Sequence, residues 1–253
     1  MSNKLDRQEE KRLENLRKNA PKDLDNENFF GLDLDEEQRH FRNSIWDKNK
    51  IIIFCNARAG TGKTLVAVGT SLLLYYYGFY ERIIYIMNPV QEQRFGFLPG
   101  DVNEKAEPYM DPLYDTLIKL GKNPKHLVIS NTTDELVIRK DTDYKPFIET
   151  KTPIYMRGTN LRNSIVILDE SQNMYTSEIM KVLTRVNDDC KVIVIGHSGQ
   201  CDLYKNPQNS GFVRAMELFK SKKDPRCGIC ELVTNHRGWV STVADELQSE
   251  IRI

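Results

Sequence analysis

The chain lacks several features that would assign it to a protein class at first reading. Its 253 residues carry 36 basic and 36 acidic side chains, so the formal net charge is zero and gives no global electrostatic argument for a nucleic-acid partner. No apolar run approaches the roughly eighteen residues of a membrane helix, and the charged N-terminus is unlike a secretory signal. There is no internal repeat and no low-complexity tract. We therefore expect a soluble protein of the cytoplasm, with no membrane partner.

Cysteine is also scarce and scattered. The five cysteines stand at positions 55, 190, 201, 227 and 230, an odd number that does not form a disulfide framework and fits a reducing compartment. Cys227 and Cys230 have the spacing of a metal knuckle or a redox pair, but no second pair completes four ligands. We expect ordinary thiols in a loop leading into a strand, and a metal or redox role stays open as an alternative.

Length and composition predict one large domain with an N-terminal extension. The 253 residues, 40% of them hydrophobic, are enough for a sizeable core. Residues 1–28 are about half charged, with few large apolar side chains before Pro21, so we predict a charged helix or a disordered arm. Its leucines lie at helical spacing, which leaves a partner-binding role open. Residues 29–253 are predicted to form a single domain.

The pattern of apolar runs predicts an α/β fold. Parallel strands are expected at residues 51–55, 82–87, 164–168, 191–195 and 229–233. Helical patterns separate most of them, which indicates an open, mostly parallel sheet covered by helices, with ligands at the carboxyl ends of its strands.

Residues 121–151 break this alternation. Apolar runs at 126–129 and 135–139 flank an Asn-Thr-Thr-Asp turn. This arrangement is typical of two short antiparallel strands. We therefore predict a small β-hairpin insertion in the domain.

A glycine-rich loop stands between the first predicted strand and an apolar helix. Its residues are Ala57, Arg58, Ala59, Gly60, Thr61, Gly62, Lys63 and Thr64. The glycines let successive N–H groups point at phosphate oxygens, the lysine adds a charge for the β- and γ-phosphates, and the final threonine a hydroxyl for Mg²⁺. The dipole of the following helix adds to the attraction. Although alanine replaces the usual first glycine, these eight residues predict a nucleoside triphosphate site.

An acidic pair, Asp169 and Glu170, directly follows the strand predicted at 164–168. We expect Asp169 to hold Mg²⁺ and Glu170 to polarise the attacking water as a general base. These two roles favour hydrolysis over binding alone. Capping of the next helix is the alternative explanation of such a pair.

The next strand is followed by Gln200, which is placed to sense the γ-phosphate or to orient the attacking water. The run Asp-Glu-Ser-Gln at 169–172 is close to the Asp-Glu-Ala-Gln of superfamily 1 helicases, which usually carry Gly-Asp-x-x-Gln at the later strand. His197 replaces that aspartate here. This replacement puts in question the coupling of ATP hydrolysis to movement that such helicases show. The alternative is that His197 is a loop histidine with no chemical role.

A further glutamine, Gln38, lies in a Leu-Asp-Glu-Glu-Gln run upstream of the phosphate loop. The run resembles the adenine-reading glutamine motif of helicases. A glutamine amide can both donate to and accept from the adenine edge, so we expect Gln38 to favour adenine over guanine. An exposed helix glutamine is the alternative.

With these parts together the chain resembles the PhoH family of P-loop ATPases. Residues 88–101 contain a segment similar to the family's Gly-Phe-Leu-Pro-Gly-Asp block, and residues 153–161 contain its Met-Arg-Gly block with Arg157. The resemblance covers about residues 34–245. It implies a RecA-like core related to superfamily 1 helicases, a homo-oligomeric and hexameric ring, and RNA or single-stranded nucleic acid as the substrate class.

In such a ring, an arginine from one subunit is expected to complete the γ-phosphate site of the next. The candidates are Arg157, Arg185 and Arg237. Arg237 lies in an Asn-His-Arg run, close to the Asn-Tyr-Arg of superfamily 1 and the reverse of the family's Arg-His pair. A surface salt bridge is the alternative role for each arginine.

The leading hypothesis is an oligomeric, Mg²⁺-dependent ATPase that couples hydrolysis to work on RNA or single-stranded DNA, with ATP and Mg²⁺ as its cofactors. The second is a nucleotide-gated assembly or binding module, in which hydrolysis is slow and resets the assembly. The third is phosphoryl transfer to a small acceptor, for which the sequence offers no recognisable lid or acceptor pocket.

Overall fold

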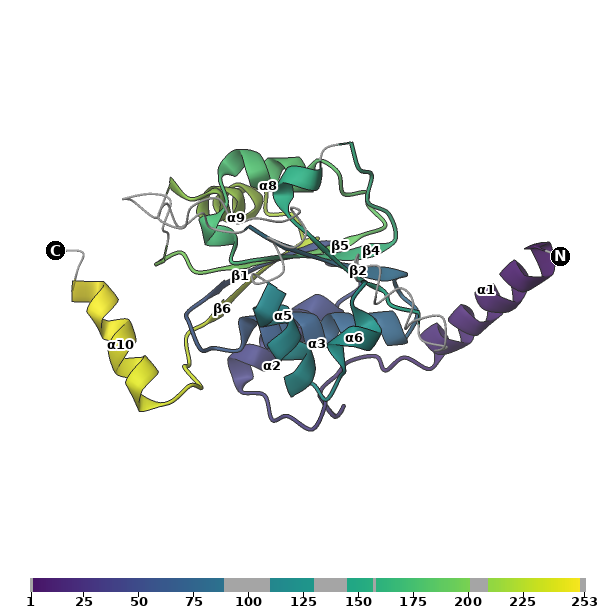
Figure 1. The fold of residues 1–253 in the computed structure, drawn as a ribbon, viewed down its shortest axis with the longest axis horizontal. Helices are drawn as coiled ribbons and strands as arrows, with labels where there is room; N and C mark the ends of the chain where they lie inside the picture. Colours follow the sequence, from purple (N-terminus) through teal and green to yellow (C-terminus); the bar gives the residue numbers. More distant parts are fainter. Residues whose placement is uncertain (1, 89–109, 130–144, 157, 201–208, 251–253) are drawn as a thin grey trace.

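Six parallel strands form one sheet with helices on both faces (Figure 1). The computed structural model describes residues 2–88, 110–129, 145–156, 158–200 and 209–250. The strands lie in the order β3-β2-β4-β5-β1-β6, and every neighbouring pair is parallel. Their bounds are β1 Ile52–Ala57, β2 Arg82–Met87, β3 Ile148–Lys151, β4 Ser164–Asp169, β5 Lys191–Gly196 and β6 Cys227–Leu232. The five predicted strands are confirmed, with ends within two residues of the prediction.

Helices shield the two faces of the sheet, so the central strands are buried on both sides. The helices α2 (Glu36–Trp46), α3 (Lys63–Tyr76), α5 (Asp111–Lys119) and α6 (Pro124–Leu127) cover one face, and α8 (Thr176–Leu183) and α9 (Gly211–Ser221) cover the other (Figure 1). Every residue of β4 and β5 is buried, which explains their uninterrupted Ile- and Val-rich sequences. Two short 3₁₀ turns, η3 (Pro153–Met156) and η4 (Ser171–Asn173), follow β3 and β4.

The order of the strands places three loops together. β5 lies between β4 and β1 and pairs with both. Because all three strands point the same way, the segments after Ala57, Asp169 and Gly196 leave the sheet at one carboxyl edge. The sequence analysis expected ligands at the carboxyl ends of the strands, and the loops that carry the candidate residues do meet at this one edge of the sheet.

The first and last helices extend from opposite ends of the molecule (Figure 1). The α1 helix, Ser2–Lys18, is the helical form of the predicted charged extension. Its C-terminal end is attached to the body, since Arg17 Nε donates to the Gly78 carbonyl at 2.7 Å. At the other end, α10 (Trp239–Glu250) runs beyond the edge strand β6. None of the described helices has the length and apolar character that a membrane span requires.

The region predicted as a hairpin insertion differs from expectation in its described parts. Residues 124–127 form α6, which takes up the first half of the strand predicted at 126–129, because Asn123 caps a turn that begins with Pro124. Val128 then forms a parallel bridge to Ile148, the first residue of β3. Residues 148–151 form β3 and extend the central sheet beside β2. The predicted second strand at 135–139 lies outside the described residues.

Candidate active site

The phosphate loop joins β1 to α3 and depends on two left-handed glycines. Gly60 and Gly62 have φ values of 76° and 78°. A Cβ atom at Gly60 would lie 2.5 Å from Asn235 Oδ1, and one at Gly62 would lie 2.8 Å from Gln38 Nε2. Both positions therefore require glycine for its conformation and for space. Within the described residues no side chain caps the N-terminus of α3, so its first N–H groups can receive an anion.

Asp169 is the buried acceptor at the centre of the site. Thr64 Oγ1 and Tyr85 Oη donate to its Oδ2 at 2.7 and 2.6 Å, and the Glu170 N–H donates to its Oδ1 at 2.8 Å. Burial raises the pKa of Asp169, against the charge of Lys63. Burial and the Asp169 charge together raise the pKa of Tyr85 well above its usual value, so the tyrosine remains a phenol that can donate.

Glu170 stands one residue beyond Asp169 in a strained backbone conformation. Its φ of 49° and ψ of 36° lie in the left-handed region, which costs energy for a residue other than glycine. This conformation turns the chain so that Glu170 Oε1 meets Lys63 Nζ at 2.7 Å, while Gln172 Nε2 donates to Oε2 at 2.6 Å. Burial alone would raise the pKa of Glu170, but these partners outweigh it and hold the pKa below its usual value. Glu170 is therefore a carboxylate.

Lys63 is the cation that faces this acidic pair. Burial tends to lower its pKa, and the charges of Asp169 and Glu170 outweigh burial and raise it. The lysine is thus held as an ammonium ion, within reach of a carboxylate that a phosphate oxygen can replace. The structure brings Lys63, Thr64, Asp169 and Glu170 into one contiguous group, as the sequence predicted.

The segment after β5 contacts the segment after β4. The His197 N–H donates to Gln172 Oε1 at 3.1 Å, and Ser171 Oγ donates to the Ile195 carbonyl at 2.7 Å. Gln200 follows in the same turn, where its N–H donates to the His197 carbonyl at 3.1 Å. Gln200 therefore lies at the predicted edge, although its side chain makes no hydrogen bond to Glu170 among the described residues.

The segment after β6 lies against the phosphate loop. The His236 N–H donates to the Gly60 carbonyl at 2.9 Å, and the His236 ring pairs with Asp35 at 2.7 Å. Asn235 Oδ1 accepts from the Arg237 N–H at 2.8 Å. The charge of Arg237 also reaches Lys63, where it opposes the rise in pKa. Arg237 is therefore beside the phosphate loop of its own chain.

Gln38 contacts the phosphate loop through protein atoms. Its Oε1 accepts from the Asp35 N–H at 3.1 Å in a capping box at the start of α2. Its Nε2 donates to the Thr61 carbonyl at 2.9 Å. Gln38 is buried, so the alternative of an exposed helix glutamine is wrong.

The remaining parts of the loop and the other arginines are less informative. Ala57 ends β1 in a buried position, and the Arg58 N–H donates to the Leu232 carbonyl at 3.1 Å. Ala59 follows in the turn. Arg185 follows α8 at the opposite, amino edge of the sheet, away from the loop of its own chain. Arg157 lies outside the described residues.

The alternative of a metal or redox site formed by Cys227 and Cys230 is wrong. Cys227 and Cys230 both lie in β6 rather than in a loop, three residues apart. Successive side chains of a strand point to opposite faces, so these two sulfurs face different layers of the molecule. Cys230 joins the core under α2 and α3, and Cys227 packs on the α8 and α9 side. Among the described residues no cluster of three His, Cys, Asp or Glu side chains could hold a metal ion.

The oxygens of the site fit a hard cation whose other ligands are water molecules and substrate phosphates. Thr64 Oγ1 and Asp169 Oδ2 lie 2.7 Å apart beside the loop, where Asp169 is buried and Thr64 is partly exposed. Mg²⁺ keeps several waters and is usually held by one or two protein oxygens with substrate phosphates. A hydroxyl and a carboxylate are thus a suitable donor set for Mg²⁺.

One contact residue was missing from the sequence prediction, and two others were noted only as parts of motifs. Tyr85, which donates to Asp169, is the one aromatic residue in the aliphatic strand β2, and that exception was an available signal. Asn235, noted before only as part of the Asn-His-Arg run, restricts the loop at Gly60 from a segment far along the chain. Gln172 was noted only as part of a motif, and the structure makes it the partner of Glu170.

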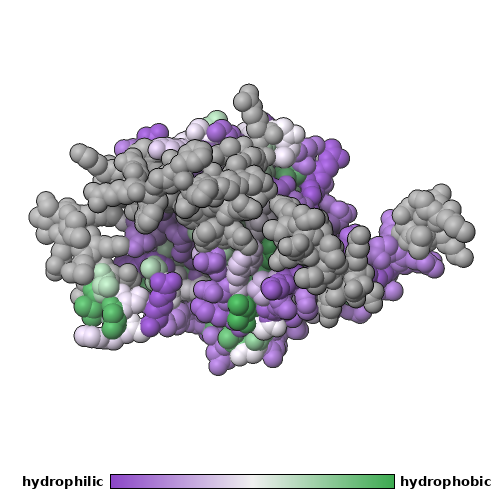
Figure 2. Space-filling model, in the orientation of Figure 1, coloured by the Kyte–Doolittle hydropathy of each residue, from purple (hydrophilic) through white to green (hydrophobic). Residues whose placement is uncertain are grey.

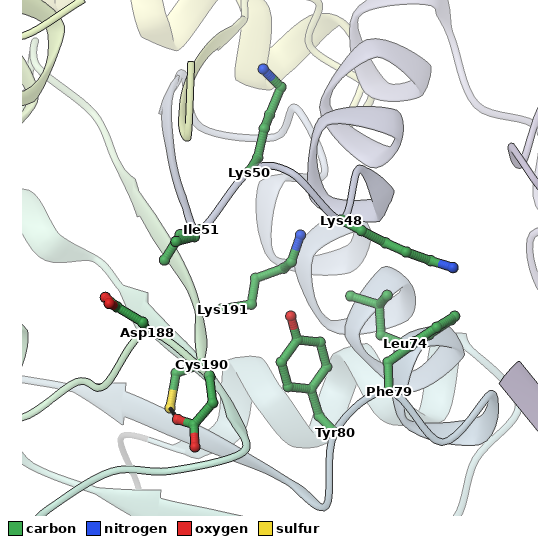
Figure 3. A pocket seen from close by; sticks show the side chains of 10 residues that line it. Lys48, Lys50, Ile51, Leu74, Phe79, Tyr80, Asp188, Cys190 and Lys191 are labelled. Carbon is green, nitrogen blue, oxygen red and sulfur yellow. Dashed lines mark hydrogen bonds between the residues drawn. The ribbon is translucent and has the colours of Figure 1, made fainter. Parts of the chain in front are cut away.

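A separate pocket of about 240 Å³ lies at the amino edge of the sheet (Figure 3). Lys191, the first residue of β5, is almost fully buried there, and the hydroxyl of Tyr80 points toward its side chain (Figure 3). Lys191 Nζ donates to the carbonyls of Ile45 and Asp47 at 2.7 Å each. No phosphate-loop residue lines this pocket, so it is distinct from the candidate site.

The parallel sheet, the glycine loop before α3 and the acidic pair after β4 define a P-loop nucleotide-binding protein. Residues 33–237 match the family described as PhoH-like protein, and the chain belongs to that family. It is 34% identical to Protein PhoH of Escherichia coli strain K12 over 201 residues, 78% of this chain and 52% of that protein. It is 35% identical to a PhoH-like protein of Bacillus subtilis over 174 residues, 68% of this chain and 50% of the relative. The chain thus spans about half the length of these curated relatives.

Solved structures with some similarity include two viral terminases. The HK97 bacteriophage large terminase has a TM-score of 0.49 at 15% identity, covering 88% of this chain and 44% of that protein. The large terminase of the thermophilic bacteriophage D6E, solved with ADP, has a TM-score of 0.47 at 13% identity, covering 79% and 46%.

Proposed function

We propose that this protein is a Mg²⁺-dependent ATPase that couples hydrolysis to binding or remodelling of RNA or single-stranded DNA as a homo-oligomeric, hexameric ring in the cytoplasm. The observation that carries the enzymatic part is the contact between Lys63 and Glu170 beside the hydrogen bond between Thr64 and Asp169. In phosphoryl transfer a lysine compensates phosphate charge, a threonine and an aspartate hold Mg²⁺, and a glutamate activates water. The four side chains suited to these tasks are adjacent here.

The first step is an exchange of partners at Lys63. Its ammonium ion is held by Glu170 at 2.7 Å, and a triphosphate entering the loop offers competing oxygens with more negative charge. When Lys63 turns to the phosphates, the Glu170 carboxylate is released from its cation. Binding of nucleotide therefore prepares the base that hydrolysis requires.

Glu170 then accepts a proton from the attacking water. The Gln172 amide keeps hold of Oε2 and orients the carboxylate, so one oxygen remains for the water. Gln200 is proposed to orient that water or sense the γ-phosphate from the neighbouring turn. Mg²⁺, when bound at Thr64 and Asp169, neutralises phosphate charge.

The nucleic-acid and ring parts of the proposal depend on family membership. Chains with one motor core need neighbouring copies to form a continuous track for a strand. In that arrangement Arg157, Arg185 or Arg237 of one copy is proposed to complete the γ-phosphate site of the next. Arg185 follows α8 at the amino edge of the sheet, away from the loop of its own chain, so its proposed target is the loop of another copy.

The test is steady-state phosphate release from ATP with Mg²⁺, with and without single-stranded RNA or DNA, using Lys63→Ala as the blank. Stimulation by one polymer supports the coupled function and identifies the polymer. Turnover indifferent to both supports the second candidate, a nucleotide-gated assembly in which hydrolysis is slow. Release no faster than the blank would contradict an ATPase of either kind.

A further inference from the structure

The first half of the last helix, α10, leaves apolar side chains exposed in the described structure. Trp239 is 78% exposed, Val240 75% and Val243 40%. Figure 2 shows hydrophobic surface where α10 begins in Figure 1. Aromatic side chains usually bury most of their area, and burying a tryptophan this exposed would contribute a large favourable free energy of transfer from water. The first half of α10 therefore has the surface of a helix that is covered in an assembly.

Two apolar side chains also remain partly exposed on and just beyond the edge strand β6. Ile229 is 37% exposed, and Val233, just beyond the strand, is 43% exposed. The alternate residues Gly228, Cys230 and Leu232 face the covered side, under α2. The opposite side of β6, toward α9, is thus only partly shielded. We name Ile229, Glu231 and Val233 the β6 strip.

The helix that follows a strand normally returns to cover its sheet, and here the linker prevents this. Val233 N–H and Thr234 N–H both donate to Glu37 Oε2, at 2.7 and 3.2 Å. His236 is held by Gly60 and Asp35. These contacts fix the linker toward α2 and the phosphate loop, on the side of the sheet away from the β6 strip. The strip is therefore accessible to α10 of another copy without breaking any of them.

The charges of the two surfaces are compatible. Residues 239–244 of α10 are uncharged, so the apolar half of the helix carries no like charge toward Glu231. Glu231 stands in the middle of the strip and is exposed. A carboxylate is stabilised near the N-terminus of a helix, and α10 begins at Trp239, beside its apolar side chains.

We propose that α10 of one copy docks on the β6 strip of a second copy of this chain, with Trp239, Val240 and Val243 packed against Ile229 and Val233. The contact joins two different surfaces, so it passes from copy to copy around a ring or is exchanged within a pair. It lies directly beyond the segment that holds the phosphate loop, which places the contact between copies next to the candidate nucleotide site. The proposal does not depend on hydrolysis.

The first test is the mass of the full chain in solution over a range of concentrations. We expect the parent to assemble and the double variant Trp239→Asp with Val240→Asp to require at least about tenfold higher concentration, because two buried apolar contacts are replaced by charges. Ile118→Asp is the matched control, since Ile118 is 61% exposed on α5, and should assemble as the parent does. A monomeric parent, or unchanged assembly of the double variant, would overturn the proposal.

The second test locates the contact. Chains carrying Ile229→Cys are mixed with chains carrying Val240→Cys under mild oxidation and compared on a non-reducing gel. A covalent pair of the two variants supports docking between copies. A mixture of Ile118→Cys and Val240→Cys should give none. A single chain that carries both Ile229→Cys and Val240→Cys tests the alternative. If this chain forms an internal disulfide while the first mixture gives no covalent pair, α10 folds onto its own strand and the proposal is wrong.

Discussion

Two buried lysines at opposite edges of the same sheet differ in their electrostatic surroundings. Lys63 at the carboxyl edge faces the carboxylates of Asp169 and Glu170, which raise its pKa despite burial. Lys191 at the amino edge donates to two backbone carbonyls, and burial lowers its pKa to about 7. Both are largely removed from water. The difference shows that partner charge, and not burial alone, decides whether a buried lysine remains a cation.

The consequence for function follows from the same contrast. Lys63 is paired with a side chain that an incoming phosphate can displace, so its charge is available to a ligand. Lys191 holds the end of α2 to the start of β5 through fixed main-chain atoms, so its task is structural. The substitutions below test this difference between a functional carboxyl edge and a structural amino edge of the sheet, from the largest expected effect to the smallest.

Lys63→Ala should have the largest effect on turnover. It removes the cation that compensates phosphate charge, so we expect ATP hydrolysis to fall by about 10² to 10³-fold or more. Lys191→Met is the matched control, because it also removes a lysine that is largely shielded from water, but at the other edge, and should retain hydrolysis in whatever fraction remains folded. Phosphate release per folded protein is the measurement. Equal loss in both variants would contradict the division of roles.

Glu170→Gln should separate binding from hydrolysis. The nucleotide contacts of the loop remain and only the proton acceptor is lost, so we expect hydrolysis to fall by about 10² to 10⁴-fold while ATP stays bound. Single-turnover hydrolysis and retention of labelled ATP on a filter measure the two quantities. Turnover comparable with the parent would show that Glu170 is not the base.

Lys191→Met should change how stability depends on pH. With the folded pKa of Lys191 at about 7 and an unfolded value near 10.5, the unfolded state binds more protons between these limits. Stability of the parent should therefore rise relative to the variant as pH increases from 7, by up to about 1.4 kcal/mol per pH unit. Urea unfolding at pH 7, 8 and 9 measures this. A difference that stays constant with pH would contradict the lowered pKa.

Local patterns predicted the strands and the phosphate loop because both are encoded within a few neighbouring residues. The edge strand β3 was missed since Ile148 is its one buried residue and the rest of the strand is polar. Tyr85 could not be assigned to Asp169 from sequence, because their contact depends on how β2 pairs with β4. The linker from Val233 onward is fixed by contacts to residues almost two hundred positions earlier, which no local pattern encodes.

Gln38→Ala tests the smallest effect, recognition of the base. One Nε2 hydrogen and one Oε1 lone pair are used by Thr61 and Asp35, and a glutamine amide retains one of each for the adenine edge. We expect preference for ATP over GTP to fall by roughly tenfold, the size of a lost hydrogen bond to a buried partner. The ratio of kcat/KM values for the two nucleotides is the measurement. Equal loss for both would contradict base recognition and indicate that Gln38 acts by holding the loop at Thr61.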